Sequence, residues 1–189
     1  MKKFAILSIA LFIVFTFGQI NVQASVAGNK IVIKKQKTEE KKSERPPLRK
    51  LEGTTINQDS QTNFYMSIGN VSDIKWIRDT YYDVATYNKD KQDMKAYFDI
   101  NGAFVGTTTI KEATDLSTSL QKSIKKLYPD ATLGQVTYFQ DNEENTTDMT
   151  LYGVQFESKN QYFVELTQGS NKLVVMCDND GNVSLFKQL

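Results

Sequence analysis

The chain has 189 residues, and its 23 Lys and Arg nearly balance its 22 Asp and Glu. It contains no His and a single Cys. This composition excludes an intramolecular disulfide, and it excludes any metal centre or general base that depends on His.

The first 24 residues are typical of a secretory signal peptide. Lys2 and Lys3 precede an apolar run of about 14 residues, which is shorter than the roughly 20 that a membrane-spanning helix needs. Val22 and Ala24 are small residues at the positions that signal peptidase reads, so we expect cleavage after Ala24. No Cys follows the run, which excludes a lipoprotein anchor. We therefore expect a periplasmic or secreted protein with no stable membrane anchor.

Residues 25–55 are predicted to form a disordered basic linker. From residue 30 to 50, nine Lys or Arg stand against three Glu, a net charge of +6. From Leu51 onward, 12 basic residues stand against 19 acidic ones, a net charge of −7. The linker is either a solvated spacer or is weakly attracted to anionic components of the cell envelope. Its basic residues are not interleaved with aromatic ones, so nucleic acid is not an expected partner.

The first half of the remaining chain predicts one helix and four strands. Residues 59–70 fit a short helix with Phe64 and Ile68 on its inner side and Gly69 at its end. Segments rich in Val, Ile, Tyr, Phe and Thr then predict strands at residues 74–77, 81–87, 94–100 and 103–110. The short turns between them favour antiparallel neighbours, because parallel strands need a crossover of about a dozen residues.

The second half repeats this order. One apolar stripe at helical spacing predicts a helix, and its members are Leu116, Leu120, Ile124 and Leu127. Thr114 or Asp115 can cap this helix, and Pro129 ends it. Further strands are predicted at residues 133–140, 149–157, 161–167, 172–178 and 182–188. The Glu- and Asn-rich residues 139–149 are predicted to be an exposed insertion.

Two similar turns, Asp-Ile-Asn-Gly ending at Gly102 and Asp-Asn-Asp-Gly ending at Gly181, raise the question of calcium binding. An EF-hand loop with Gly at position 6 needs an oxygen ligand at position 1 and a bidentate Glu at position 12. In the first turn, Tyr97 and Thr108 hold those two positions, and the second turn lacks both ligands as well. We therefore interpret both as hairpin turns, whose Asn-Gly and Asp-Gly pairs tolerate positive φ angles.

The order of these elements predicts an α+β fold. Two tandem units, residues 58–110 and 111–189, would each consist of a helix and an antiparallel β-meander. Together they would form a broad curved antiparallel sheet with the helices packed against it. The folded domain is expected to span residues 56–189.

This pattern resembles the PepSY-like, β-lactamase-inhibitor-like proteins, which are exported proteins found largely in Bacteroides-type bacteria. The resemblance is carried by Trp76 in the opening strand, by Tyr97-Phe98-Asp99-Ile100-Asn101-Gly102, by Leu127-Tyr128-Pro129 and by Asp178-Asn179-Asp180-Gly181. It implies a helix packed against an antiparallel sheet, repeated twice, with a concave sheet face. Leu116-Ser117 stands where family members commonly have Leu-Pro. The family has no established catalytic residues, so the resemblance implies neither a catalytic residue nor a cofactor.

We expect a non-enzymatic binding module that recognises a protein or peptide partner. Trp and Tyr are favoured anchors at interfaces. The candidate contact residues are Trp76, Tyr81, Tyr87, Tyr138 and Tyr152, and the alternative for each is a place in the core against the helices. A carrier of a small apolar ligand or lipid is the second candidate, and a deep apolar cavity would distinguish it.

A hydrolase is the third candidate, because catalysis by paired carboxylates needs no His. Asp79 with Asp83, or Glu143 with Glu144, could form such a pair, but neither pair has apolar surroundings that would raise an acid's pKa. Cys177 shares a strand face with apolar residues, so we expect a buried side chain and not a reactive thiol.

Overall fold

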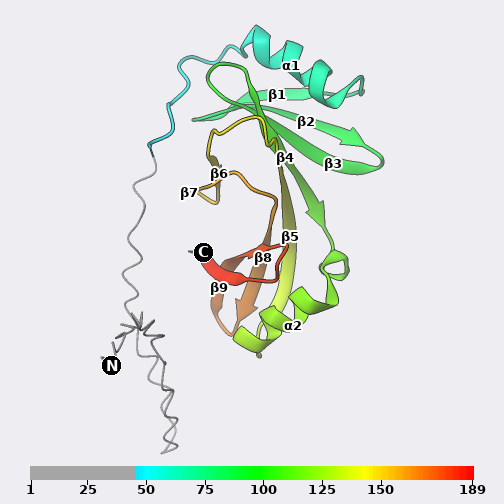
Figure 1. The fold of residues 1–189 in the computed structure, drawn as a ribbon, viewed down its shortest axis with the longest axis vertical. Helices are drawn as coiled ribbons and strands as arrows, with labels where there is room; N and C mark the ends of the chain where they lie inside the picture. The colour runs from blue at the N-terminus through cyan, green and yellow to red at the C-terminus, as the bar shows by residue number, and fades with distance from the viewer. Residues whose placement is uncertain (1–45) are drawn as a thin grey trace, which may run out of the picture. The chain divides into compact units, whose positions relative to one another are not determined.

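A computed structural model describes residues 46–189 of the chain (Figure 1). The predicted signal peptide and most of the predicted linker lie outside these residues. No helix within residues 46–189 is long and apolar enough to cross a membrane.

The described part contains two α-helices, one short 3-10 helix and ten strands. The helices are α1 (Gln58–Ile68), η1 (Ala113–Asp115) and α2 (Thr118–Leu127). The strands are β1 (Lys75–Arg78), β2 (Asp83–Lys89), β3 (Gln92–Phe98), β4 (Phe104–Lys111), β5 (Thr132–Asp141), β6 (Met149–Leu151), β7 (Val154–Phe156), β8 (Gln161–Gln168), β9 (Asn171–Asp178) and β10 (Val183–Gln188).

Eight strands form one antiparallel sheet in the order β1-β2-β3-β4-β5-β8-β9-β10. The first four strands follow α1 as one meander, and β5, β8, β9 and β10 follow α2 as a second. The predicted α+β fold of two helix-plus-meander units in one broad antiparallel sheet is therefore confirmed. In this arrangement β1 corresponds to β5, β2 to β8, β3 to β9 and β4 to β10.

The second unit departs from the first after β5, where β6 and β7 form a separate two-stranded hairpin. The prediction of a single strand over residues 149–157 was wrong. A two-residue turn, Tyr152-Gly153, divides that segment, and both residues have positive φ angles of 51° and 72°. Two-residue hairpin turns with positive φ at both positions strongly prefer Asn or Gly, so Tyr152 concealed the turn.

The helix α2 begins later than the sequence indicates. Its N-cap is Ser117, whose hydroxyl accepts a hydrogen bond from Leu120 N at 3.2 Å, while the predicted caps lie in η1. Leu116 precedes the helix in an extended conformation, although its side chain is buried as expected. At the other end, Leu127 is 57% exposed, so the buried stripe ends at Ile124.

Both helices cover the same face of the sheet, which we call the helix face. Phe64 of α1 packs against Ala85, Ala96 and Phe98, and Ile124 of α2 packs in a second apolar cluster over the second unit. Strand registers place these two clusters on one side of the sheet, and Figure 1 shows α1 and α2 on that side.

The opposite face, which we call the hairpin face, is covered by the β6–β7 hairpin (Figure 1). Met149 and Phe156 of the hairpin are 0% and 5% exposed. They join side chains of both units in a third cluster, which includes Tyr82, Val84, Tyr97, Val105, Phe139, Phe163 and Val174. Phe139 and Met149, the two ends of the predicted insertion at residues 139–149, are therefore buried in the core, whereas Glu143 and Glu144 at its centre are exposed.

The two Asp-x-(Asn/Asp)-Gly turns have the same hydrogen bonds. Asp99 Oδ1 accepts from Asn101 N at 2.9 Å and Ala103 N at 3.0 Å. Asp178 Oδ1 accepts from the two corresponding amides of its own turn, at 3.0 and 2.9 Å. The prediction of hairpin turns is confirmed, with one difference: only Gly102 and Gly181 have positive φ, at 76° and 90°.

Residues 46–57 form no helix or strand, yet they are attached to the domain. Leu51 N donates to Thr80 O at 2.9 Å, and Gln155 Nε2 donates to Pro46 O at 3.0 Å. Leu48 also packs against the cluster on the hairpin face. Pro46, Leu48 and Leu51, which fall within the predicted linker, thus contact the folded domain.

Candidate functional site

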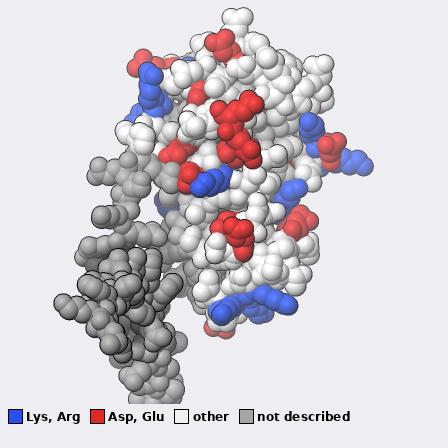
Figure 2. All heavy atoms as spheres, viewed as in Figure 1, with Lys and Arg blue, Asp and Glu red and all other residues white. Residues whose placement is uncertain are grey.

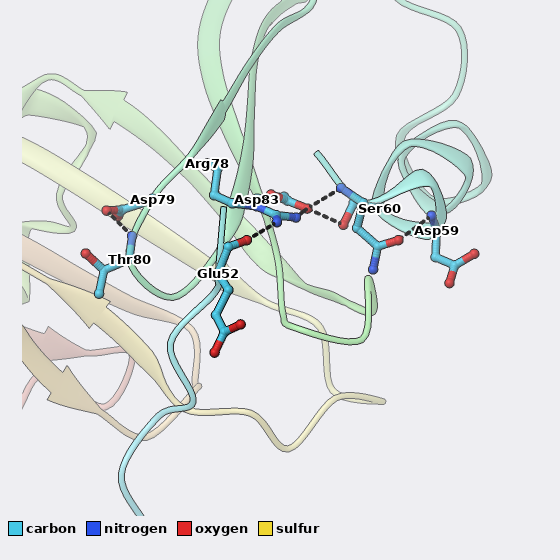
Figure 3. Close-up of polar contacts among 8 residues, drawn as sticks. Glu52, Asp59, Ser60, Arg78, Asp79, Thr80 and Asp83 are labelled. Carbon is cyan, nitrogen blue, oxygen red and sulfur yellow. Dashed lines mark hydrogen bonds and ion pairs between the residues drawn. The ribbon is translucent and has the colours of Figure 1, made fainter. Parts of the chain in front are cut away.

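Among residues 46–189, the most buried charged group is the Asp83 carboxylate at the start of β2 (Figure 3). Arg78, at the end of β1, donates to it through Nε at 2.8 Å and Nη2 at 2.9 Å. Asn57 N and Ser60 Oγ donate to it as well, at 2.8 and 3.1 Å. Arg78 Nη1 donates to Glu52 O at 2.8 Å. This cluster ties the segment before α1 to the β1–β2 connection.

Its hydrogen bonds make this cluster a structural element. Burial alone would raise the pKa of Asp83, but the hydrogen bonds from Arg78, Asn57 N and Ser60 lower it below the ordinary 3.8. A general acid needs the opposite shift. Asp79 is exposed and accepts from Thr80 N, outside the Asp83 cluster. The first candidate carboxylate pair therefore lacks the surroundings of an acid–base pair.

The other candidates for chemistry are placed as follows. Glu143 and Glu144 are exposed in the loop after β5. Cys177 is fully buried on the helix face, and burial raises the pKa of its thiol to about 12, with the nearby Asp178 carboxylate adding to the shift. No group of three or more Cys, Asp or Glu side chains within residues 46–189 could hold a metal ion.

Two of the five aromatic candidates lie on the helix face against α1. Trp76 packs on Phe64 and Phe98, with ring centroids 5.6 Å apart in both pairs. Tyr87 packs on Phe64 at 5.2 Å and is 3% exposed, so it has almost no surface to offer a partner.

Two further candidates are half-buried. Tyr81 packs against the cluster on the hairpin face and lies beside Tyr82, with ring centroids 6.3 Å apart. Tyr138 lies on the helix face and packs on Tyr162 at 4.7 Å. Neither side chain lines a pocket described below.

Tyr152, the fifth candidate, lies at the tip of the β6–β7 hairpin. Its hydroxyl donates to Glu165 Oε1 on β8 at 3.1 Å, which fastens the tip to the sheet. Burial and the adjacent Glu165 carboxylate raise the pKa of the Tyr152 hydroxyl. Leu151 packs against the same core cluster as Tyr152.

A groove of about 290 Å³ lies between this tip and the central strands, and we call it the hairpin groove. Tyr97 and Thr108 line it, with their hydroxyl oxygens 3.0 Å apart. Ile110, 51% exposed, and Lys95 line it too. Sequence reasoning missed these strand residues, although Thr108 and Ile110 alternate with Thr107 and Thr109 at the period of two that separates strand faces.

Charge is unevenly distributed over the folded part. In Figure 2, acidic side chains gather near the middle of the visible face, and basic side chains gather at its lower end, over α2. This helix carries Lys122, Lys125 and Lys126. The net charge of −7 from residue 51 onward therefore leaves α2 as a basic area on an acidic domain.

Comparisons with solved structures support the fold. A DUF2874 family protein from Bacteroides uniformis superposes with a TM-score of 0.59 at 15% identity, over 71% of this chain and 90% of that chain. A protein from Bacteroides eggerthii described as periplasmic gives 0.56 at 14% identity, over 71% and 88%. A BLIP-like protein from Bacteroides fragilis gives 0.53 at 19% identity, over 71% and 86%. No protein-family model and no curated protein matches the chain.

Proposed function

We propose that the protein is an exported, non-enzymatic binding module of the PepSY-like, β-lactamase-inhibitor-like type, and that it recognises a protein or peptide through the hairpin groove. Tyr152 is the observation that carries this proposal. A φ of 51° is unfavourable for a bulky side chain and costs about 1–2 kcal/mol, which Asn or Gly would largely avoid. Strained residues of this kind cluster at binding sites, where the surrounding structure holds them.

The surroundings of Tyr152 have the composition of a protein interface. Ile110 lines the groove and is 51% exposed, and its strand register places it on the hairpin face. Lys95 adds a charge beside the apolar surface. Interfaces combine aromatic and aliphatic anchors with a polar rim in this way.

The packing of the hairpin favours a surface binder over a carrier. A carrier would enclose its apolar ligand between the sheet and another layer, and on the hairpin face Met149 and Phe156 occupy that space. The groove that remains has hydroxyl groups in its lining, which suits the polar backbone of a peptide better than a lipid chain.

A capture experiment with two matched variants tests this function. The purified protein, Ile110→Lys and Leu127→Lys would each be incubated with periplasmic and outer-membrane extracts. Leu127 is the control because it is 57% exposed and lies at the end of α2. We expect one protein to be retained by the wild type and by Leu127→Lys, and to be lost with Ile110→Lys.

Two results would refute the proposal. The first is equal loss with both Lys variants, and the second is recovery of a lipid or glycan in place of a protein. Tyr152→Asn supplies a further arm, because Asn tolerates the positive φ while the ring is removed. This variant should weaken capture, while the relief of backbone strain offsets part of the stability lost with the ring and its hydrogen bond to Glu165.

Export itself remains a proposal. It rests on the predicted signal peptide and on the likeness to a protein described as periplasmic. N-terminal sequencing of the protein recovered from the periplasm or medium should begin at Ser25, and a chain that retains Met1 in the cytoplasm would contradict it.

A further inference from the structure

A second pocket, of about 390 Å³, lies on the helix face between α1 and the loop that follows β5. Asn63 and Ser67 of α1 line it together with Glu144 of the loop and Phe104 of β4. An adjoining pocket of about 210 Å³ shares Ser67 and Phe104 but is also lined by Lys89, whose ammonium donates to Ile68 O at 3.2 Å. We call the larger pocket alone the α1 pocket. Because it lies on the opposite side of the sheet from the hairpin groove, its ligand does not depend on the function proposed for that groove.

The carboxamides that line this pocket direct their nitrogens to the backbone. Asn63 Nδ2 donates to Gly102 O at 2.8 Å, and Asn142 Nδ2 donates to Phe104 O at 2.8 Å. Within residues 46–189, the Oδ1 atoms of both Asn and the carboxylate of Glu144 make no hydrogen bond. The polar groups that remain for a ligand are thus mainly acceptors, and one of them is negatively charged.

These acceptors select for a cationic donor. An anion would be repelled by Glu144, and an apolar ligand would leave amide oxygens without partners. A guanidinium or ammonium group brings several N–H donors and a positive charge, and it interacts favourably with an aromatic ring such as that of Phe104. The net charge of −7 from residue 51 onward adds long-range attraction. We propose that the α1 pocket binds a basic side chain, Arg or Lys, presented by a protein or peptide.

The direct test is an NMR titration of the complete exported chain with two short peptides. Acetyl-Gly-Arg-Gly-amide carries the guanidinium, and the citrulline analogue has nearly the same shape without the charge. We expect the amide signals of Ala103 and Phe104 to shift progressively with the Arg peptide only, with a Kd on the order of 1 mM. Equal shifts with the citrulline peptide would overturn the proposal.

Adjacent glutamates provide the matched control. Glu144→Gln removes the charge from the pocket lining, whereas Glu143→Gln makes the same change to a neighbouring exposed residue outside it. We expect Glu144→Gln to weaken binding about two- to fivefold and Glu143→Gln to leave it unchanged. The same weakening in both variants would mean diffuse attraction and would reject the pocket.

Two further arms separate a basic side chain from a metal ion. Ser67→Arg should place a guanidinium of the protein itself in the pocket and abolish peptide binding. Ser67 is an exposed position of α1, and Arg is the better helix former there. Calcium chloride should leave the signals unchanged. If calcium shifts them and the Arg peptide does not, the pocket is a hard-cation site and the proposal is wrong.

Discussion

Replacement of Arg78 by Met should destabilise the domain strongly, because it leaves the Asp83 carboxylate buried without its cation. The carboxylate has a side-chain exposure of 0%, and Arg78 provides two of its four hydrogen bonds. Removal of one partner from a buried ion pair costs about 3–5 kcal/mol. For a domain of this size, 1 kcal/mol corresponds to about 2–4 °C, so the melting temperature should fall by about 10 °C.

Urea denaturation followed by circular dichroism measures this loss, and a double variant isolates the charge effect. Arg78→Met with Asp83→Leu should recover part of the stability, because apolar replacement of a whole buried pair is often neutral or favourable. Lys159→Ala is the control, since its 2.9 Å pair with Glu157 is largely exposed and such pairs contribute about 0–1 kcal/mol. Two results would refute the reasoning. One is a loss in the free energy of unfolding below about 1 kcal/mol for Arg78→Met, and the other is a loss in the double variant equal to the sum of the losses in the two single variants.

Three further predictions follow from burial and backbone geometry. In urea denaturation, Gly102→Ala should lower the free energy of unfolding more than Gly181→Ala does. Both glycines have positive φ angles, which strain an Ala, but only at Gly102 would the added Cβ lie 2.7 Å from Asp59 Cβ. Equal losses would contradict the packing of α1 on this turn. Cys177 should react with a thiol reagent only after unfolding, because burial raises its pKa to about 12; rapid labelling of the native protein would show that it is accessible. Stability should fall as the pH rises above about 9, since the folded-state pKa values of Cys177 and Tyr87 are raised above their unfolded values of 9.0 and 10.0; Tyr87→Phe should reduce this dependence, and an unchanged urea midpoint between pH 8 and pH 11 would contradict it.

The repeat was predictable from sequence because its markers act locally. Asp99 and Asp178 accept hydrogen bonds from amides two and four residues further along their own turns. Short polar side chains that bond to the nearby backbone give the same turn wherever the same sequence occurs. The two turns therefore gave the positions of the equivalent β3–β4 and β9–β10 hairpins without any knowledge of the tertiary fold.

The candidate contacts were less predictable because an aromatic residue in a strand has two faces available. Trp76 and Ile77 are neighbours in β1, yet Trp76 faces α1 and Ile77 is 59% exposed on the hairpin face. The register of β1 with β2 and the position of α1 decide which face of the sheet each residue of β1 occupies. The sequence of this short strand determines neither of them. The Arg78–Asp83 cluster was missed for a similar reason, since Asn57 and Ser60 reach it from more than 20 residues away.

The β6–β7 hairpin is needed because the two repeated units leave one face of the sheet without a helix to cover it. Two meanders in one broad sheet have two apolar areas on the helix face, and each unit covers its own with a helix. The hairpin face also carries apolar side chains from both units, such as Val84 and Phe163, and neither unit has a second helix to cover them. An insertion between β5 and β8 satisfies this requirement because it emerges beside the boundary of the two units and places Met149 and Phe156 on it. The same insertion ends in the strained Tyr152, so the element that completes the core also forms one wall of the proposed binding groove.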